Sequence, residues 1–231
     1  MEAIAAEKDI DKVLLQTKTS SEIHNELFQL LREKEISFQF VPIEKLNRIT
    51  RKNHQGVVAF ISQISYTPLD EIIAGSYETG RDPFILVLDH LSDVRNFGAI
   101  ARTAECAGMN GIVIPDKGSV SISSDAVKTS AGALMTLPVA RVGSLRESVR
   151  FLKEAGLTVV AATEKSETLL FDVDLSGPIA IILGAEDKGV SPGLLELADY
   201  SLKIPLYGKI ESLNVSAASA IFLNCIFLCF F

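Results

Sequence analysis

The chain has 231 residues, of which 48% are hydrophobic and 22% charged, and its formal net charge is −7. This length allows one or two domains with a sizeable core, and the composition is that of a folded globular protein. Because 22 basic residues stand against 29 acidic ones, the chain is not a protein that coats nucleic acid by bulk positive charge. Any contact with nucleic acid must therefore be local.

A few features of the sequence indicate the cellular compartment and whether the chain is anchored in a membrane. Cys106, Cys225 and Cys229 are too few for a disulfide framework, and no histidine lies near them to complete a zinc site, so we expect reduced thiols. The first 12 residues carry charges where a signal peptide has an apolar run. The apolar ending, residues 221–231, is shorter than the roughly 20 residues of a membrane span. We expect a cytoplasmic protein without membrane or metal, whose ending is a buried helix or strand, a partner surface or a sequence artefact.

The first 65 residues predict a small alternating α/β unit. A helix is expected over 19–35, where Thr19 and Glu22 form a capping box and apolar residues follow at helical spacing. Short apolar runs predict three strands around it, at 12–16, 36–42 and 56–62.

The most basic stretch of this acidic chain, residues 43–56, lies between the second and third of these strands. It contains one acid, Glu44, and five basic or titratable side chains: Lys45, Arg48, Arg51, Lys52 and His54. Such a cluster suits local contacts with RNA phosphates, and the alternative is an ordinary solvated loop.

Residues 66–82 lose periodicity and gather Pro, Gly, Ser and Thr, which is typical of a linker. A second pattern follows, in which apolar runs alternate with helix-like segments. Continuous apolar runs are typical of strands buried on both faces, so they predict a parallel sheet with helices on both sides. The expected strands are 84–89, 111–115, 137–142, 157–163, 179–184 and 201–206.

Three loops at the carboxyl ends of these strands contain the candidate chemistry, because ligands bind there in open parallel sheets. In the first loop, Asn96 and Gly98 lead into a helix with Arg102 one turn further on. The second loop reads GAEDKGVSP, and the third segment reads IPLYGKIESLNVSAASA. Each has an ordinary alternative: turn residues, a surface arginine or a cap of the last helix. A phosphate-binding P-loop is excluded, because Val190 stands where that motif needs lysine.

Taken together, the three motifs are far more specific than any one. N-F-G-A-I-A-R, L-G-A-E-x-x-G and I-P-L-x-G-x-x-x-S-L-N-V-S-x-A, in this order, closely resemble the motifs of the SpoU (TrmH-like) RNA ribose 2′-O-methyltransferases of the SPOUT superfamily. The resemblance covers about residues 82–220. The first unit resembles the small substrate-binding domain, related to kink-turn-binding ribosomal proteins, that precedes the catalytic domain in guanosine methyltransferases of large-subunit rRNA.

The resemblance implies an RNA-binding domain at 1–65, a linker at 66–82 and a parallel-sheet SPOUT domain at 83–231 with a C-terminal trefoil knot. It also implies a homodimer with the cofactor site near the interface. The implied cofactor, S-adenosylmethionine, would contact Gly184, Ile204 and Leu213, with Leu183, Leu206, Thr163 and Ser212 close by.

The implied reaction is methyl transfer to a ribose 2′-hydroxyl of structured RNA, expected to be a guanosine of 23S rRNA. The implied catalytic residues are Arg102, Asn96, Glu186 and Asn214, and the implied RNA-binding residues are Lys45, Arg48, Arg51 and Lys52. A guanidinium stays protonated, so we expect Arg102 to hold a phosphate and stabilise developing negative charge instead of acting as a base. The alternatives are a tRNA substrate or a non-catalytic RNA-binding ribosome assembly factor.

Overall fold

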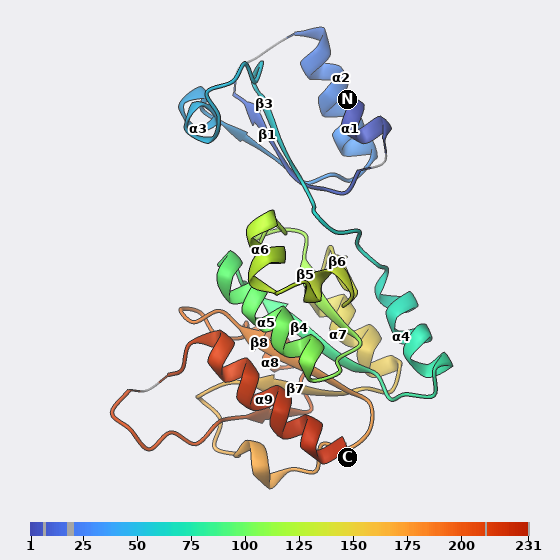
Figure 1. Ribbon diagram of the computed structural model, residues 1–231, viewed down its shortest axis with the longest axis vertical. Helices are drawn as coiled ribbons and strands as arrows, with labels where there is room; N and C mark the ends of the chain where they lie inside the picture. Colours follow the sequence, from blue (N-terminus) through green and yellow to red (C-terminus); the bar gives the residue numbers. More distant parts are fainter. Residues whose placement is uncertain (7, 18–20, 211, 231) are drawn as a thin grey trace. The chain divides into compact units, whose positions relative to one another are not determined.

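The computed structural model describes residues 1–6, 8–17, 21–210 and 212–230 and divides into two compact units (Figure 1). Unit 1 comprises Met1–Ser65 with Ser121–Ser123, and unit 2 comprises Tyr66–Val120 together with the chain from Ser124 onward. Each unit has its own sheet and its own core.

Unit 1 is built on a three-stranded sheet in the order β2-β1-β3. The central strand β1 (Ile10–Gln16) pairs in parallel with β2 (Phe38–Val41) and antiparallel with β3 (Val57–Ile61). Side chains alternate between the two faces of β1: Val13 and Leu15 pack against helix α2 (Glu22–Glu33), as a strand period of two requires. The three predicted strands are confirmed.

The opposite face of this sheet is covered by a short helix that the sequence did not predict. Leu14 of β1 packs there with Val41 and with Leu46, the buried residue of α3 (Ile43–Ile49). Helix α3 falls inside the basic stretch 43–56, so the first part of that stretch is a helix anchored through Leu46. A further short helix, α1 (Glu2–Ala5), precedes β1.

Helix α2 begins differently from the expected capping box. It starts at Glu22, and Ser21 caps it by accepting a hydrogen bond from the His24 backbone N–H at 3.3 Å. Thr19, expected as the cap, lies outside the described residues.

Residues 66–82, whose composition suggested a linker, contain helix α4 (Leu69–Glu78). Its Leu69, Ile72 and Ile73 are buried in the core of unit 2. The helix is short and contains Gly75, and only three of its buried positions are apolar, so periodicity in the sequence does not reveal this face.

Unit 2 contains a six-stranded sheet in the order β6-β5-β4-β8-β7-β9, in which every paired neighbour is parallel. This confirms the predicted α/β class. The strands are β4 (Phe84–Asp89), β5 (Gly111–Pro115), β6 (Val139–Val142), β7 (Thr158–Ala162), β8 (Ile179–Gly184) and β9 (Tyr200–Leu202).

Helices cover both faces of this sheet. Ile85 and Val87 of β4 pack in a core with α4, α7 (Leu145–Glu154) and α8 (Pro192–Leu195). The intervening Leu86 and Leu88 are also buried and point to the opposite face. There α5 (Val94–Cys106) packs beside α6 (Ser124–Thr129) and α9 (Val215–Phe230), and Figure 1 shows α5 and α9 side by side. Two single turns, η1 (Ala133–Met135) and η2 (Leu170–Asp172), complete unit 2.

The last strand is shorter than its apolar run predicted. Strand β9 ends at Leu202, and the expected continuation through Leu206 leaves the sheet. Lys203 still forms an isolated parallel bridge with Leu169, and Pro205 lacks the N–H that a longer strand would need. The residues after β9 therefore form a loop.

The apolar ending of the chain belongs to α9. Phe222, Leu223 and Ile226 are buried on its inner side, whereas Leu228 is 73% exposed. Phe231 lies outside the described residues. Among the described residues, no helix combines the length and apolar character needed to cross a membrane, and no three His, Cys, Asp or Glu side chains gather to hold a metal.

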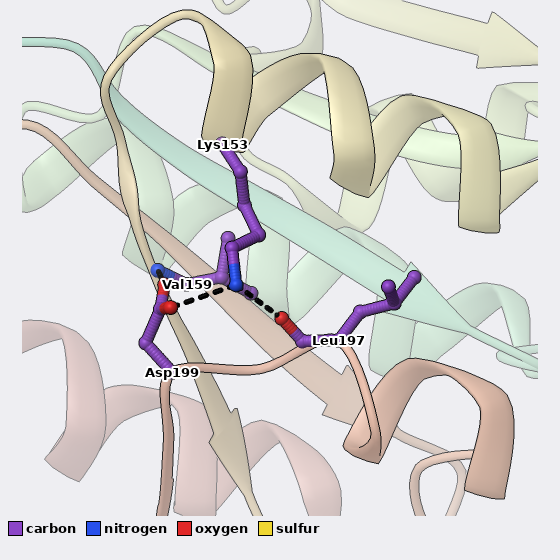
Figure 2. Close-up of polar contacts among 4 residues, drawn as sticks. All are labelled: Lys153, Val159, Leu197 and Asp199. Atoms are coloured by element: carbon purple, nitrogen blue, oxygen red, sulfur yellow. Dashed lines mark hydrogen bonds and ion pairs between the residues drawn. The ribbon is translucent and has the colours of Figure 1, made fainter.

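A group of polar contacts between Lys153, Asp199 and their backbone partners holds the first residues of β7 (Figure 2). Lys153 Nζ lies 2.7 Å from Asp199 Oδ1 and donates to the Leu197 carbonyl at 2.9 Å, while Asp199 Oδ2 accepts from the Val159 N–H at 2.9 Å. Burial alone raises the pKa of Asp199, but the hydrogen bonds from Lys153 and Val159 and the charge of Lys153 outweigh it, so the pKa is lowered.

This contact gives a pH-dependent stability. A carboxylate with a lowered folded-state pKa stabilises the native state above the unfolded pKa of about 3.9, and that contribution disappears as the pH falls through the folded pKa. Asp199→Asn should therefore lower the free energy of unfolding at pH 7, and the difference from wild type should shrink below about pH 4. Urea unfolding at both pH values measures this. Equal differences at both would contradict the assignment.

Candidate active site

The candidate site lies at the carboxyl edge of the unit 2 sheet, where parallel strands bring distant loops together. Strands β4, β8 and β7 are neighbours, so the segments that follow them start side by side. All three sequence motifs meet at this edge, together with the turn after β7.

The loop after β8 is held by the last residue of β4, Asp89, which is 3% exposed. Its Oδ2 accepts a hydrogen bond from the Ser191 N–H at 2.7 Å, and its carbonyl accepts from the Ala185 N–H at 3.1 Å. These two hydrogen bonds tie the loop after β8 to the end of β4. The sequence analysis did not identify Asp89, although a carboxylate that ends a fully buried strand was a usable signal.

The same loop folds back tightly on Gly184. Gly189 donates its N–H to the Ala185 carbonyl at 2.7 Å and adopts a φ of +65°, a conformation that favours glycine. A Cβ added to Gly184 would lie 2.0 Å from the Gly189 carbonyl carbon and 2.3 Å from the Val190 nitrogen. Only glycine fits here, because backbone occupies the space of a side chain.

Asn214 connects the three motifs through hydrogen bonds. Its Nδ2 donates to Asn96 Oδ1 at 3.2 Å and to Glu186 Oε1 at 2.5 Å, and the same Glu186 oxygen accepts from the Val215 N–H at 3.1 Å. Its Oδ1 accepts from the Ser216 N–H at 2.9 Å, which caps α9. Because both ends of the amide have partners, the side chain is fixed in one orientation.

The structure places these residues somewhat differently from the expected loop-to-helix arrangement. Helix α5 starts at Val94, capped by Asp93, whose Oδ1 accepts from the Asn96 N–H at 2.8 Å. Asn96 and Gly98 are therefore inside the first turns of α5. Gly98 lets α6 approach, since a Cβ there would lie 2.8 Å from the Ala126 carbonyl oxygen.

Arg102 lies outside the hydrogen-bonded cluster formed by Asn96, Glu186 and Asn214. It is exposed on α5, six residues after Asn96 and so about 9 Å further along the helix axis. In the described part of the chain it makes no ion pair or hydrogen bond, and it does not line the neighbouring pocket. Its guanidinium is thus available to a group that approaches from solvent.

A pocket of about 330 Å³ opens between the turn after β7, the loop after β8 and the segment before α9. All seven residues predicted to contact the cofactor line it: Thr163, Leu183, Gly184, Ile204, Leu206, Ser212 and Leu213. Lining residues that the sequence analysis missed include Glu164, Lys165, Lys188, Lys203, Ala218 and Phe222. They lie in turns and loops at the carboxyl edge or on the inner face of α9, and no local pattern marks them.

The lining of this pocket suits a charged nucleoside such as S-adenosylmethionine. Its volume falls in the usual range for small-ligand sites. Apolar side chains such as Leu183, Ile204 and Leu213 provide walls for a flat base. Glu164 and Asp187 provide negative charge for a cationic group, and Lys203 provides positive charge for a carboxylate.

The predicted RNA-binding residues lie in unit 1 and take no part in this pocket. Lys45 and Arg48 are exposed on α3, and Arg51 and Lys52 are exposed in the loop that follows. That loop is closed by a 2.9 Å contact between His54 Nε2 and Asn47 Oδ1.

Family models match nearly the whole chain. The SpoU rRNA Methylase family matches residues 83–224, and a model for RNA 2′-O ribose methyltransferase substrate binding matches residues 1–67. YacO of Bacillus subtilis, named for the TrmH family of tRNA/rRNA methyltransferases, is 33% identical over 96% of this chain and 89% of its own length. A Staphylococcus saprophyticus protein named for the same family is 32% identical over 98% of this chain and 91% of its own length.

Solved structures show the same fold. The SpoU methyltransferase AviRb from Streptomyces viridochromogenes, in complex with AdoMet, has a TM-score of 0.64 at 24% identity, covering 98% of this chain and 85% of its own. The A. aeolicus TrmH/SpoU tRNA modifying enzyme has a TM-score of 0.58 at 26% identity, covering 64% of this chain and 75% of its own. With both family models matched and the pocket in place, the chain belongs to the SpoU rRNA methylase family and is an S-adenosylmethionine-dependent RNA 2′-O ribose methyltransferase.

Proposed function

We propose that the enzyme methylates the ribose 2′-hydroxyl of a guanosine in large-subunit (23S) rRNA. The observation that carries the catalytic part is the meeting of Asn96, Glu186 and Asn214 beside the pocket at the carboxyl edge of the sheet. Support for rRNA comes from the name of the matching family and from the amino-terminal substrate-binding match. Methylation of tRNA is the second candidate, since the relatives are named for both RNAs and one structural neighbour is described as a tRNA modifying enzyme.

The pocket residues have distinct proposed roles. When bound, S-adenosylmethionine would supply an electrophilic methyl carbon to the ribose 2′-oxygen. Gly184, Ile204 and Leu213, with Leu183, Leu206, Thr163 and Ser212, hold the cofactor in the pocket. The apolar walls exclude water from its methyl group.

The polar residues orient the reacting groups. Asn214, fixed by Asn96 and Glu186, keeps the start of α9 and the loop after β8 in one geometry. Arg102 binds the phosphate next to the target ribose and stabilises negative charge that develops on the 2′-oxygen. A guanidinium remains protonated, so the hydroxyl proton leaves to water instead of to Arg102.

RNA selection falls to the first domain in this proposal. Residues 1–65 bind the RNA and residues 83–231 transfer the methyl group, and residues 66–82 join them through α4, which packs in the core of unit 2. The basic residues that contact RNA phosphates are Lys45, Arg48, Arg51 and Lys52, because a few clustered cations suffice to bind the backbone of folded RNA.

The same family membership supports three further proposals: a trefoil knot in the C-terminal part, a homodimer and a cytoplasmic location. Exposed Tyr207 and Ile210, which follow the pocket wall, suit a dimer contact.

The proposal is tested by supplying labelled S-adenosylmethionine with 23S rRNA or with bulk tRNA, each from a strain that lacks the enzyme. We expect label on rRNA, and mapping of the product should place it on one guanosine 2′-oxygen. Label on tRNA alone would favour the second candidate. If neither RNA accepts label while the cofactor still binds, the chain is an RNA-binding assembly factor, the non-catalytic alternative.

A further inference from the structure

Three phenylalanine rings meet on one side of the unit 1 sheet. Phe28 comes from α2, and Phe38 and Phe40 are alternate residues of β2, so both strand rings point to the same face. The ring centroids of Phe28 and Phe38 are 5.2 Å apart, those of Phe28 and Phe40 are 5.8 Å apart, and those of Phe38 and Phe40 are 5.9 Å apart. We call these three residues the aromatic cluster.

The members of the aromatic cluster differ in burial. Phe28 and Phe38 are partly buried and pack against the core of Val13, Leu15, Leu27 and Leu31. Phe40 does not belong to that core and is 51% exposed. It stands on β2, an edge strand, where proteins usually place charged residues to prevent unwanted pairing. Core packing therefore explains why Phe28 and Phe38 are aromatic, but it does not explain why a large apolar side chain stands at the exposed position 40.

An arginine completes the cluster. The guanidinium carbon of Arg32 lies 5.5 Å from the centroid of Phe28, in cation–π geometry, and the side chain is exposed. An arginine above an aromatic ring still has N–H groups at the edge of its guanidinium that can donate to phosphate. The cluster thus combines an open aromatic face with a cation.

This chemistry fits an unpaired nucleobase of RNA. Single-stranded bases are recognised by stacking on aromatic rings and on arginine planes. The domain that contains the cluster matches a substrate-binding model for RNA methyltransferases. The basic residue Lys45 follows Phe40 by five positions, on helix α3, which covers the opposite face of the same small sheet. Phosphate contacts and a stacking surface therefore lie in adjacent segments of the chain.

We infer that Phe40, supported by Phe28, Phe38 and Arg32, forms a stacking subsite for an unpaired base of the substrate RNA. This deepens the proposed function and rests on it, since it names a structural element that the RNA must present near the first domain. Stacking supplies affinity without a strict base requirement, because every base has a π-face. The subsite thus selects RNA with an unpaired nucleotide, and the basic residues contribute salt-dependent attraction.

The test compares the affinity of wild type, Phe40→Ala, Phe40→Leu and Phe40→Trp for unmodified 23S rRNA at several salt concentrations. Phe40→Ala should weaken binding by ~5- to 150-fold, the range for loss of one stacked base. Phe40→Leu should stay weak because it restores apolar area but no π-face, whereas Phe40→Trp should bind like wild type. Phe40→Ala should keep the wild-type salt dependence, whereas replacing Lys45, Arg48, Arg51 and Lys52 by glutamine should reduce it.

The matched control is Ile61→Ala on β3, the other edge strand, since Ile61 is 43% exposed and the change should leave affinity unaltered. Wild-type affinity in Phe40→Ala, or full recovery in Phe40→Leu, would overturn the stacking subsite. So would a changed oligomeric state with unchanged RNA affinity, which would assign Phe40 to a contact between copies. If wild type itself neither binds nor methylates the RNA, the proposed function fails instead, so the two failures are distinguishable.

Discussion

Arg102→Ala should abolish methyl transfer while leaving the affinity for S-adenosylmethionine within about twofold of wild type. Arg102 is exposed on α5, outside both the pocket and the hydrogen-bonded cluster, so its removal leaves the cofactor walls intact. Loss of one donor to a developing oxyanion typically slows turnover by ~10²- to 10³-fold, and loss of the phosphate contact adds to this. Single-turnover methylation with saturating RNA measures the rate, and calorimetry measures cofactor binding.

Two variants sharpen this experiment. Arg102→Lys keeps the charge but loses the planar fork that binds phosphate through two hydrogen bonds, so it should recover only part of the rate. Arg150→Ala removes another exposed arginine, on α7, and should behave like wild type. A wild-type rate in Arg102→Ala, or a large loss of cofactor affinity, would refute the role proposed for Arg102.

Gly184→Ala should destroy cofactor binding and destabilise unit 2. The new Cβ would lie 2.0–2.3 Å from backbone atoms of Gly189 and Val190, so the loop after β8 must move. Overpacking of this kind typically costs ~1–3 kcal/mol, and the moved loop would distort the pocket wall. We expect affinity for S-adenosylmethionine to fall by more than about tenfold, with a lower melting temperature.

The matched control is Gly143→Ala, in the turn before α7. Gly143 has no positive φ and no atom within 4 Å of the position of a new Cβ, so the added methyl is accommodated. Calorimetry with S-adenosylmethionine and thermal unfolding of both variants complete the comparison. If Gly184→Ala binds the cofactor as wild type does, the close approach of the two loop segments has no role in forming the pocket.

The strands of both sheets were predictable because their signal is local. The run FILVLD is apolar at five of its six positions and is buried throughout β4, and the other runs behave similarly. The helices α3 and α4 were not predicted, since seven to ten residues with few buried positions leave little periodicity. Both helices are stabilised by tertiary packing, α3 through the buried Leu46 and α4 through the buried Ile72, and a local sequence pattern does not show such packing.

Only those residues of the candidate site that belong to short sequence motifs could be predicted. The seven predicted cofactor contacts and the residues Asn96, Glu186 and Asn214 came from the family resemblance, and the structure brings them to one edge. The contacts themselves join segments up to 118 positions apart, as between Asn214 and Asn96, and no local pattern specifies them. Asp89 has a local signal, as the carboxylate that ends a buried strand, but its contact with Ser191 spans 102 positions and no local pattern specifies that contact.

The long sequence separation between Asp89 and Ser191 has a consequence for how the enzyme folds. Contacts of such high order form late, since the entropy of closing the intervening chain is lost before they contribute. The loop after β8 can therefore settle only once β4 and β8 are paired along their register, Phe84 with Ile179 through Asp89 with Gly184. Affinity for S-adenosylmethionine should appear last on the refolding pathway, and a cellular supply of it should shift newly made chains toward the native state by mass action.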